Sequence, residues 1–471
     1  MKLEKYILPI LVYLLLTSCK NKQVETYDLV ILNGQTIDLA TGKIALQNLY
    51  IRDGKFVKIE TSGNSDPYKA DETIDATGTY ILPGFWDNHA HFRGGDSLIL
   101  ENKNLLPLFL ANGITTVRDA GGDLTSSVMQ WKKEIAAGTL DGPTIYTSGP
   151  KIDGPDGTWA GSLEVKTDED ISKALDSLQA LKTDFVKLYD SRISGDAYLK
   201  TLKETDKRGL ITSGHMPFTV TLEETVDAGI DAIEHLYYIM KGCSAVEAEV
   251  TQMLINKEIG FWQAMPLLLE GYQNSTAKAT FALLKNKNVF VVPTLHIGET
   301  LSYLDEVDHR NDPYLKYMGK GIIKTYQGRI NGALNASEKA RKDRKELDHF
   351  FGTLTKSLND AGVKLLAGSD SGAFNSYTYP GISLHKELEA MVQAGMTPLE
   401  ALKTSAYHGA QYLKKDQLSG SIEIGKQADV VLLEANPLED IRNTQKIYTV
   451  IQNSKVYSKD QLKAMLEGVT R

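Results

Sequence analysis

The chain has 471 residues, of which 52 are Lys or Arg and 60 are Asp or Glu, so its formal net charge is −8. This length suits one large barrel with a smaller module, or roughly three domains of ~150 residues. Hydrophobic residues make up 42% and charged residues 24% of the chain, which excludes a disordered tail protein, a fibre and a multi-span membrane protein. The acidic balance and the absence of a basic stripe make nucleic acid a poor candidate partner.

The first residues have the layout of an export signal. Lys2 and Lys5 precede an apolar run over residues 6–16, which is shorter than the ~20 residues that a transmembrane helix needs. We therefore expect residues 1–18 to be a signal peptide that is removed from the mature protein.

The quartet Leu16-Thr17-Ser18-Cys19 ends this run and resembles a bacterial lipobox, in which the cysteine is lipidated and becomes the first mature residue. The alternative is a plain signal peptide followed by a chance cysteine. The small residues directly before Cys19 favour the lipobox, so we expect lipid attachment at Cys19 and a polar tether over residues 19–27. The expected product is an exported, membrane-anchored lipoprotein on the periplasmic or outer cell surface.

Short strands are expected at both ends of the mature chain. In residues 28–82, apolar runs alternate with the hairpin dipeptides Asn33-Gly34 and Asp53-Gly54. In residues 416–471, the runs over residues 429–433 and 448–451 have the same character. We expect these two segments to pack together as one small β-sandwich.

Between these segments, over residues 83–415, apolar strands alternate with amphipathic helices. Alternating strands and helices predict a parallel sheet, and eight such units predict a closed (β/α)8 TIM barrel of the α/β class. Residues 250–272 interrupt the alternation as an excursion, although 261–264 could form a strand, and a charged stretch near 297–360 predicts a helical insertion over the mouth of the barrel. The expected barrel strands span residues 85–91, 113–119, 144–148, 185–189, 210–215, 232–235, 289–294 and 364–370.

Four histidines and one aspartate fall at the ends of expected strands. His89 and His91 are two residues apart on the first strand, so their side chains point to the same side, into the barrel. His215, His235 and Asp370 end the fifth, sixth and eighth strands, at the edge where barrel active sites are built. Neutral imidazoles and a carboxylate are ligands of divalent metals. Any one of these residues alone could be a hydrogen-bonded core residue, but five on one rim indicate a metal site.

Lys187 lies in the buried strand over residues 185–189, where an unpaired ammonium is costly. Burial lowers the pKa of a lysine and favours the neutral amine. A neutral amine can take up CO2 to form a carbamate, an anion able to bridge two metal ions ~3.5–4 Å apart. The alternative is an ion pair with Asp184 or Asp190 at the rim, but the neighbouring ligand candidates favour the carbamate.

The segment Pro83-Gly84-Phe85-Trp86-Asp87-Asn88-His89-Ala90-His91 resembles the first-strand signature of the amidohydrolase superfamily. The resemblance covers nearly the whole mature chain. Within the superfamily, the chain is similar to the branch that includes imidazolonepropionase and Xaa-Pro dipeptidases. It continues in order through residues 113–119, Lys187, residues 214–215, 233–235, 368–370 and 425–429. The loop over residues 153–159 lacks the histidine that we would expect in a prolidase-like relative.

This resemblance implies a ligand set and a mechanism. The two histidines of the first strand would bind the more buried metal with Asp370, and His215 and His235 would bind the second. Carboxylated Lys187 and a hydroxide would bridge these two divalent ions, which we expect to be Zn²⁺ because the set is rich in imidazole. Asp370 would also be the catalytic residue, since it would take a proton from the attacking hydroxide and deliver it to the leaving nitrogen.

These features predict a metal-dependent hydrolase of amide, dipeptide or cyclic amide C–N bonds with a small-molecule substrate. Tyr189 and Tyr237, each two residues beyond a ligand candidate, are candidate substrate contacts, with aromatic packing at the rim as the alternative. Two other functions stay open. One is a non-catalytic lipoprotein that binds a small molecule on the same fold, and the other is a deaminase, whose relatives usually use one metal and lack the lysine. The sequence leaves the oligomeric state open, and a homo-oligomer is compatible with it.

Replacing Cys19 with serine tests the anchor. Cys19→Ser removes the thiol that receives the lipid, and the fold begins beyond this residue, so we expect a folded, active protein in the soluble fraction. Cell fractionation followed by an immunoblot measures its distribution. Ser18→Ala keeps a small residue before the cysteine and is the matched control, which should stay in the membrane fraction. A membrane-bound Cys19→Ser protein would point to a different anchor.

Overall fold

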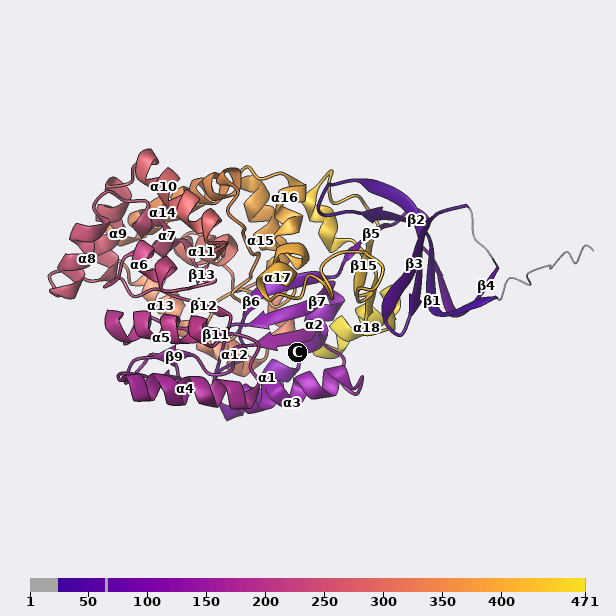
Figure 1. Cartoon of the computed structure of the whole chain (residues 1–471), viewed down its shortest axis with the longest axis horizontal. Coiled ribbons are helices and arrows are strands. Elements are labelled where there is room, and N and C mark those ends of the chain that lie inside the picture. The colour runs from indigo at the N-terminus through magenta and orange to yellow at the C-terminus, as the bar shows by residue number, and fades with distance from the viewer. Residues whose placement is uncertain (1–23, 64–66, 471) are drawn as a thin grey trace, which may run out of the picture.

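The computed structural model describes residues 24–63 and 67–470 of the chain. Cys19 and the expected signal peptide lie outside the described residues. Strands from both ends of the chain form a sheet at one end of the molecule, and strands surrounded by helices make up the rest (Figure 1). Among the described residues, no helix combines the length and the apolar character needed to cross a membrane.

The terminal sheet joins the two ends of the chain. Its strands follow the order β17-β16-β15-β5-β1-β2-β3, with β4 paired to β1. Strand β15 pairs antiparallel with β5, so the first and last segments are in direct contact. The bounds are β1 (Glu25–Ile37), β2 (Ile44–Arg52), β3 (Lys55–Thr61), β4 (Tyr68–Asp75), β5 (Tyr80–Pro83), β15 (Val430–Leu433), β16 (Ile447–Gln452) and β17 (Lys455–Ser458).

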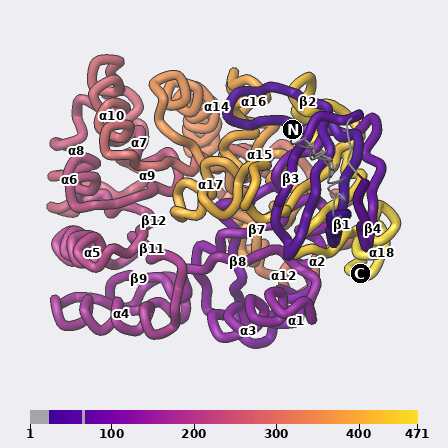
Figure 2. Tube along the Cα trace, turned by 45° about the vertical axis from the view of Figure 1, so that its right-hand side comes forward, coloured from indigo at the N-terminus to yellow at the C-terminus, as the bar shows by residue number. Residues whose placement is uncertain are grey.

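The terminal sheet departs from the expectation in its details. Its strands form one connected sheet, and the two-layered sandwich stays a prediction. Strand β1 begins at Glu25, inside the expected tether, because residues 25–27 pair with residues 68–70 of β4. The C-terminal segment ends in a helix, α18 (Lys459–Val469), which a capping box at Ser458 starts and which packs against α2 (Leu106–Ala111). Figure 2 shows α18 on the same side of the molecule as the N-terminal strands.

The central region contains two parallel sheets, which include seven of the eight expected barrel strands. Buried, mostly apolar runs form these strands, as is typical of parallel sheets covered on both faces. The first sheet has the order β6 (Phe85–Ala90), β7 (Ile114–Asp119) and β8 (Thr144–Thr147). The second has the order β10 (Leu163–Glu164), β9 (Ile152–Asp153), β11 (Val186–Leu188), β12 (Thr212–Gly214), β13 (Ala232–Glu234) and β14 (Phe290–Val292).

The eighth expected strand, residues 364–370, is not assigned as a strand. It makes isolated parallel bridges between Leu365 and Val291 and between Ser371 and Ala90, so it lies between the two sheets. Its end departs from extended geometry because Asp370 adopts a φ of 51°. The arrangement is therefore TIM-barrel-like, and complete closure of the barrel stays a prediction.

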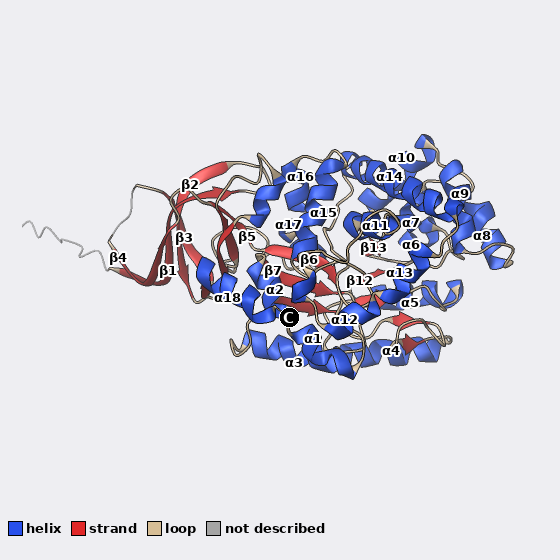
Figure 3. Cartoon of the chain, turned by 180° about the vertical axis from the view of Figure 1, so that it is seen from behind, coloured by secondary structure: helices blue, strands red, loops and turns tan. Residues whose placement is uncertain are grey.

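Helices surround the central strands, as Figure 3 shows. Two of them start with the expected capping boxes, Thr221 with Glu224 and Thr397 with Glu400. The helices of this layer are η1 (Asp96–Leu98), α1 (Ile99–Lys103), α2, α3 (Thr125–Ala136), α4 (Asp168–Leu181), α5 (Gly195–Lys207), α6 (Leu222–Asp227), α7 (Leu236–Gly242), α10 (Asn274–Asn286), α15 (Ile382–Gln393), α16 (Pro398–Lys403), α17 (Ala406–Tyr412) and η3 (Ile441–Gln445).

Two further groups of helices break the simple alternation. Helices α8 (Glu247–Ile255) and α9 (Phe261–Glu270) form the excursion before α10, and residues 261–264 are helical. Residues of α11, α13 and α14 line the cavity above the strand ends, so the charged insertion lies over the mouth of the central region. The insertion consists of α11 (Leu295–Ser302), η2 (Leu315–Tyr317), α12 (Lys320–Thr325), α13 (Gln327–Leu334) and α14 (Glu338–Ala361).

Asn88 fixes the first central strand to later parts of the chain. Its buried Nδ2 donates hydrogen bonds to the carbonyl oxygens of Ala367 at 3.1 Å and of Thr404 and Ser405 at 3.2 Å. Because Asn88 directly precedes His89, these hydrogen bonds also position the strand that carries the first pair of ligand candidates.

Asn88→Ala removes these buried side-chain hydrogen bonds, each worth about 0.5–1.5 kcal/mol, so we expect the free energy of unfolding to fall by about 1–3 kcal/mol. Each of the three carbonyl oxygens keeps a backbone N–H donor. Urea unfolding followed by circular dichroism measures this change. Asn335→Ala, at an exposed position, is the control and should stay within about 0.5 kcal/mol of the native chain. Unchanged stability of Asn88→Ala would mean that these side-chain hydrogen bonds do not stabilise the strand.

Candidate metal centre

The side chains of His89, His91 and Asp370 meet at the carboxyl ends of the central strands. The Nε2 atoms of His89 and His91 are 3.2 Å apart. Oδ1 of Asp370 lies 3.1 Å from Nε2 of His91 and 3.5 Å from Nε2 of His89. Three atoms that are typical metal ligands therefore converge at one point.

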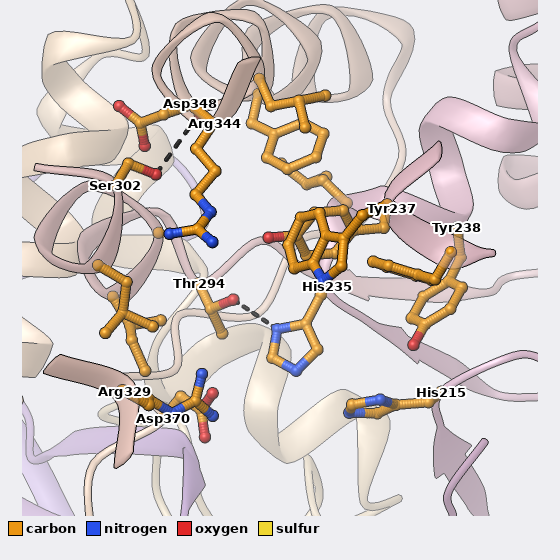
Figure 4. A pocket seen from close by; sticks show the side chains of 18 of the residues that line it. His215, His235, Tyr237, Tyr238, Thr294, Ser302, Arg329, Arg344, Asp348 and Asp370 are labelled. Atoms are coloured by element: carbon orange, nitrogen blue, oxygen red, sulfur yellow. Dashed lines mark hydrogen bonds between the residues drawn. The ribbon is translucent and has the colours of Figure 1, made fainter. Parts of the chain in front are cut away.

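His235 and His215 extend this group. Ligand atoms of His89, His235 and Asp370 all lie within 4.8 Å of one another. The ring centroids of His215 and His235 are 4.8 Å apart. Figure 4 shows both rings in the cavity together with Asp370. The structure thus brings together the five residues that the strand ends predicted.

Hydrogen bonds at Nδ1 orient the first two imidazoles. Nδ1 of His91 lies 2.9 Å from the carbonyl oxygen of Gly121, which can only accept, so the proton of His91 is on Nδ1. Nδ1 of His89 lies 2.7 Å from Oε2 of Glu234, and a carboxylate also accepts. In both rings Nε2 therefore keeps its lone pair and faces the centre.

The other two imidazoles are oriented in the same way. Nδ1 of His215 donates to Oδ1 of Asp190 at 3.2 Å. Nδ1 of His235 lies 2.7 Å from Oγ1 of Thr294, whose single proton is donated to the carbonyl oxygen of Pro293, so His235 is the donor of this pair. Engagement of Nδ1 by an oxygen is the arrangement found around metal-binding histidines, because it presents Nε2 as a ligand.

Burial keeps these imidazoles neutral. Burial lowers the pKa of His89. Burial is also the main reason why the pKa values of the other three histidines lie well below the usual range of an imidazole. Positive charges of neighbouring Lys and Arg side chains add to this effect. The four rings are those of His89, His91, His215 and His235. Neutral imidazoles with free Nε2 atoms fit a divalent cation without displacing a proton.

Asp370 is held as a carboxylate. Burial alone would raise its pKa, but the adjacent His89 and His91 hold the pKa of Asp370 well below its usual range. Nδ2 of Asn375 donates to its Oδ1 at 2.7 Å. The φ of 51° at Asp370 turns the side chain out of the strand direction and into this group.

Lys187, in β11, is a buried amine without a hydrogen-bond acceptor. Its exposure is 0%, and among residues 24–63 and 67–470 its Nζ has no hydrogen-bond partner. The nearest carboxylate oxygen is Oε1 of Glu234 at 3.5 Å, and Arg118 already occupies this oxygen at 2.8 Å. Burial lowers the pKa of Lys187 to about 8.

The rim ion pair that the sequence left as an alternative for Lys187 is not formed. Asp184 binds Lys132, and Asp190 accepts hydrogen bonds from His215 and Tyr238. The buried amine is therefore not accounted for by a partner at the rim.

A cavity of about 680 Å³ opens above these residues, and His215, His235 and Asp370 lie in its wall. Tyr189 and Tyr237, the candidate substrate contacts, both line it. The ring of Tyr189 also packs against His215, with 4.3 Å between the centroids. Each tyrosine can therefore contact a bound molecule as well as support the wall.

The residues that orient the imidazoles were not singled out from the sequence. Glu234 offered a signal, because a carboxylate inside an otherwise apolar strand needs a partner. Asp190 was considered only as a partner of Lys187. Thr294 and Gly121 carry no sequence signal of this role, because they become neighbours of the histidines only through the fold.

Thr294 provides a test of this orientation. Thr294→Ala removes the acceptor of His235 Nδ1, and such changes typically lower metal affinity by about 10–100-fold. Competition with a chromogenic chelator measures the affinity for Zn²⁺. Thr294→Ser keeps the hydroxyl and should bind Zn²⁺ as the native chain does. If Thr294→Ala bound Zn²⁺ equally well, the hydroxyl would not orient a ligand.

Comparisons with known proteins place the chain in a family. The chain matches the Amidohydrolase family over residues 80–457. Ochratoxinase from Aspergillus niger is 22% identical over 423 residues, with 78% of this chain and 72% of the relative covered. Among solved structures, bottromycin amidohydrolase has a TM-score of 0.74 at 20% identity, with 93% of this chain and 90% of that chain covered. A Xaa-Pro dipeptidase with methionine bound in its active site has a TM-score of 0.67 at 18% identity, with 91% and 99% covered. Because the family match spans most of its length, this chain belongs to the Amidohydrolase family.

Proposed function

We propose that this protein is a metal-dependent hydrolase that cleaves an amide C–N bond in a small molecule, such as a dipeptide or a cyclic amide. The observation that carries the proposal is the convergence of four neutral, buried imidazoles and one carboxylate at the base of a cavity of substrate size. Family membership supports it, as do the names of two relatives, an ochratoxinase and a Xaa-Pro dipeptidase.

Two divalent ions would bind to this set, and zinc matches imidazole ligands best. The two histidines of β6 and its end, with Asp370, form one group of ligands, and His215 and His235 form the other. Bound divalent ions supply Lewis acidity, which activates water and polarises a carbonyl group. A closed (β/α)8 barrel around the ligands would keep the two groups at a fixed separation.

Lys187 would complete the set as a carbamate. In this step the lone pair of the neutral Nζ attacks the carbon of CO2, an N–C bond forms while one C–O π bond opens to an oxyanion, and the proton released from nitrogen passes to water, so a neutral amine becomes an anion. The missing acceptor at Nζ among the described residues and the lowered pKa of Lys187 support this step. The carbamate oxygens would provide further ligands for the divalent ions.

Asp370 is placed to move the proton. Its contacts with Asn375, His91 and His89 all use Oδ1, so Oδ2 is the oxygen that carries the proton. As water attacks the substrate carbonyl carbon, Oδ2 accepts a proton from it. The C–N bond then breaks, and Oδ2 returns the proton to the leaving nitrogen.

The alternatives are less well matched. A protein that only binds a small molecule would not need a carboxylate and four oriented imidazoles at the base of its cavity. A single-metal deaminase would not need a buried amine such as Lys187 beside them. We also propose that the protein is exported and anchored through a lipid on Cys19.

Lys187→Met tests the carbamate. It fills the same space but cannot react with CO2, so we expect the metal content to fall from about two ions per chain to one or fewer. Elemental analysis of protein purified without chelator measures the metal content. Lys132→Met, which removes a lysine paired with Asp184 away from the centre, is the control. Full metal content in Lys187→Met would exclude the carbamate.

The pH dependence of metal uptake gives a second test. At fixed dissolved CO2, reactivation of the metal-free native protein should accelerate between about pH 7 and about pH 9, because the fraction of Lys187 present as the free amine rises through its lowered pKa.

Asp370→Asn tests proton transfer. Asparagine keeps the shape and one oxygen ligand but cannot accept the proton, so kcat should fall by at least ~10²–10⁴-fold. Metal content and the Kd of a non-hydrolysable substrate analogue should change little, because the other ligands remain. Asp308→Asn, on the surface of the insertion, is the control and should keep native turnover. Native turnover in Asp370→Asn would show that another group transfers the proton.

A further inference from the structure

The insertion contributes two arginines to the wall of the cavity. Arg329 lies in α13 and Arg344 in α14, and both line the same cavity as His235 and Asp370. Figure 4 shows the two arginines on the side of the cavity that carries Thr294 and Asp370, and the side chain of Arg344 extends into it. Neither residue belongs to the proposed metal centre, so their presence in this wall needs a separate explanation.

Arg329 is positioned next to the proton-transferring residue. Its Nε donates to the carbonyl oxygen of Phe374 and its Nη2 to Oδ1 of Asn375, both at 3.0 Å. Asn375 in turn donates to Asp370. This chain of hydrogen bonds fixes the guanidinium beside the centre and leaves its remaining N–H groups free to meet a ligand.

Neither cavity arginine has a carboxylate partner. Within the described parts of the chain, no Asp or Glu oxygen lies within 4.0 Å of the guanidinium of Arg329 or Arg344. By contrast, Arg341 is on the same helix as Arg344 but lies outside this cavity. Its Nε is 3.8 Å from a carboxylate oxygen of Asp305. Asp348 also lines the cavity, one turn after Arg344, but burial raises its pKa to about 7, so it does not neutralise the two arginines fully.

Both positive charges face one cavity. Arg329 and Arg344 line it together with Tyr237 and Trp262. The guanidinium of Arg344 lies 5.7 Å from the ring centroid of Trp262. Two guanidiniums in the wall of one cavity, beside a carboxyl that is only partly ionised, form a site for a carboxylate, which Arg binds in a bidentate manner.

An aromatic surface completes the cavity. Phe261, Trp262 and Phe351 pack around Tyr237, with ring centroids 5.0–6.1 Å from it. Trp262 keeps 56% of its surface exposed, although it lines a cavity. Exposed aromatic surface in a cavity favours a bulky apolar group of the ligand.

We propose that Arg329 and Arg344 bind a carboxylate of the substrate, and that the substrates are N-acyl amino acids or dipeptides with a bulky apolar side chain. This inference rests on the proposed amide hydrolysis and defines its substrate class. The amide carbonyl faces the metal centre, the free carboxylate meets the two guanidiniums, and the apolar side chain packs against the aromatic surface.

A matched pair of substrates tests the proposal. N-acetyl-L-phenylalanine carries the carboxylate, and N-acetyl-2-phenylethylamine has the same amide and ring but lacks it. With the metal-loaded native enzyme, we expect kcat/KM to be about 10–100-fold higher for the first compound, the factor expected for a charge-assisted hydrogen bond. Equal values would overturn the carboxylate site and leave amide hydrolysis standing.

Arg344→Gln separates binding from a structural role. Its KM for N-acetyl-L-phenylalanine should rise about 10–100-fold with kcat nearly unchanged, while both constants for N-acetyl-2-phenylethylamine stay as in the native enzyme. Arg329→Lys keeps the charge but not the bidentate geometry, and its KM should rise less than that of Arg329→Gln. Arg341→Gln is the control on the same helix and should match the native enzyme.

The remaining outcomes are also decisive. Equal losses for both compounds in Arg344→Gln would assign the residue a structural role and overturn the proposal. If the native enzyme cleaved neither compound but cleaved uncharged anilides or lactams, the substrate class would be wrong and the proposed function would stand. If the metal-loaded enzyme cleaved no amide at all, the proposed function would fail, and this inference with it.

Discussion

One buried carboxylate holds the interior of the central region together. Glu234, in β13, accepts hydrogen bonds from Arg118 in β7, Ser213 in β12 and His89 in β6. Four strands of the two sheets thus converge on a single charge with 0% exposure. A buried charge is tolerated only when it is paired and hydrogen-bonded, so these contacts require the strands to keep one relative register. The same register brings the ligand candidates to one end of the strands, which makes the metal centre a consequence of how the interior charge is satisfied.

Much of the fold follows from local patterns. Buried apolar runs predicted seven of the central strands because parallel strands covered on both faces leave few polar residues in the run. The segment ending at Asp370 makes only isolated bridges with its neighbours, and its backbone turns at Asp370, whose carboxylate meets the histidines. The terminal sheet could not be specified fully either, since β5 pairs with β15, more than 340 residues later, and such pairing depends on the whole fold.

At the site, too, some features follow from local patterns and others depend on the whole fold. The spacing of His89 and His91 and the strand-end positions of His215, His235 and Asp370 predicted which side chains converge, because alternation on strands and alignment of parallel strand ends are local rules. The oxygen acceptors behind the rings could not be predicted in this way. Thr294 becomes a neighbour of His235 only when β13 and β14 align, and it lies 59 positions further along the chain. Lys187 stood out through the cost of burying an ammonium in its strand, but only the neighbouring ligand candidates favoured the carbamate over an ion pair at the rim.

Chemistry and selectivity therefore depend on different parts of the chain. The ligand candidates and their acceptors belong to the central strands or their ends, where a shift of even one strand would disturb Glu234 and its partners. The two cavity arginines belong to helices α13 and α14 of the insertion, and most of the aromatic surface to α9 and α14. These helices contact the cavity but supply no ligand candidate, so substitutions on them can change which amide is accepted without displacing a metal-binding side chain. Arg329 is the point where the two parts meet, because its hydrogen bond to Asn375 couples the insertion to Asp370. A ligand carboxylate bound there would tighten the same hydrogen-bond chain that positions Asp370, so binding of the proposed anionic substrate and alignment of the proposed catalytic carboxylate would be physically coupled.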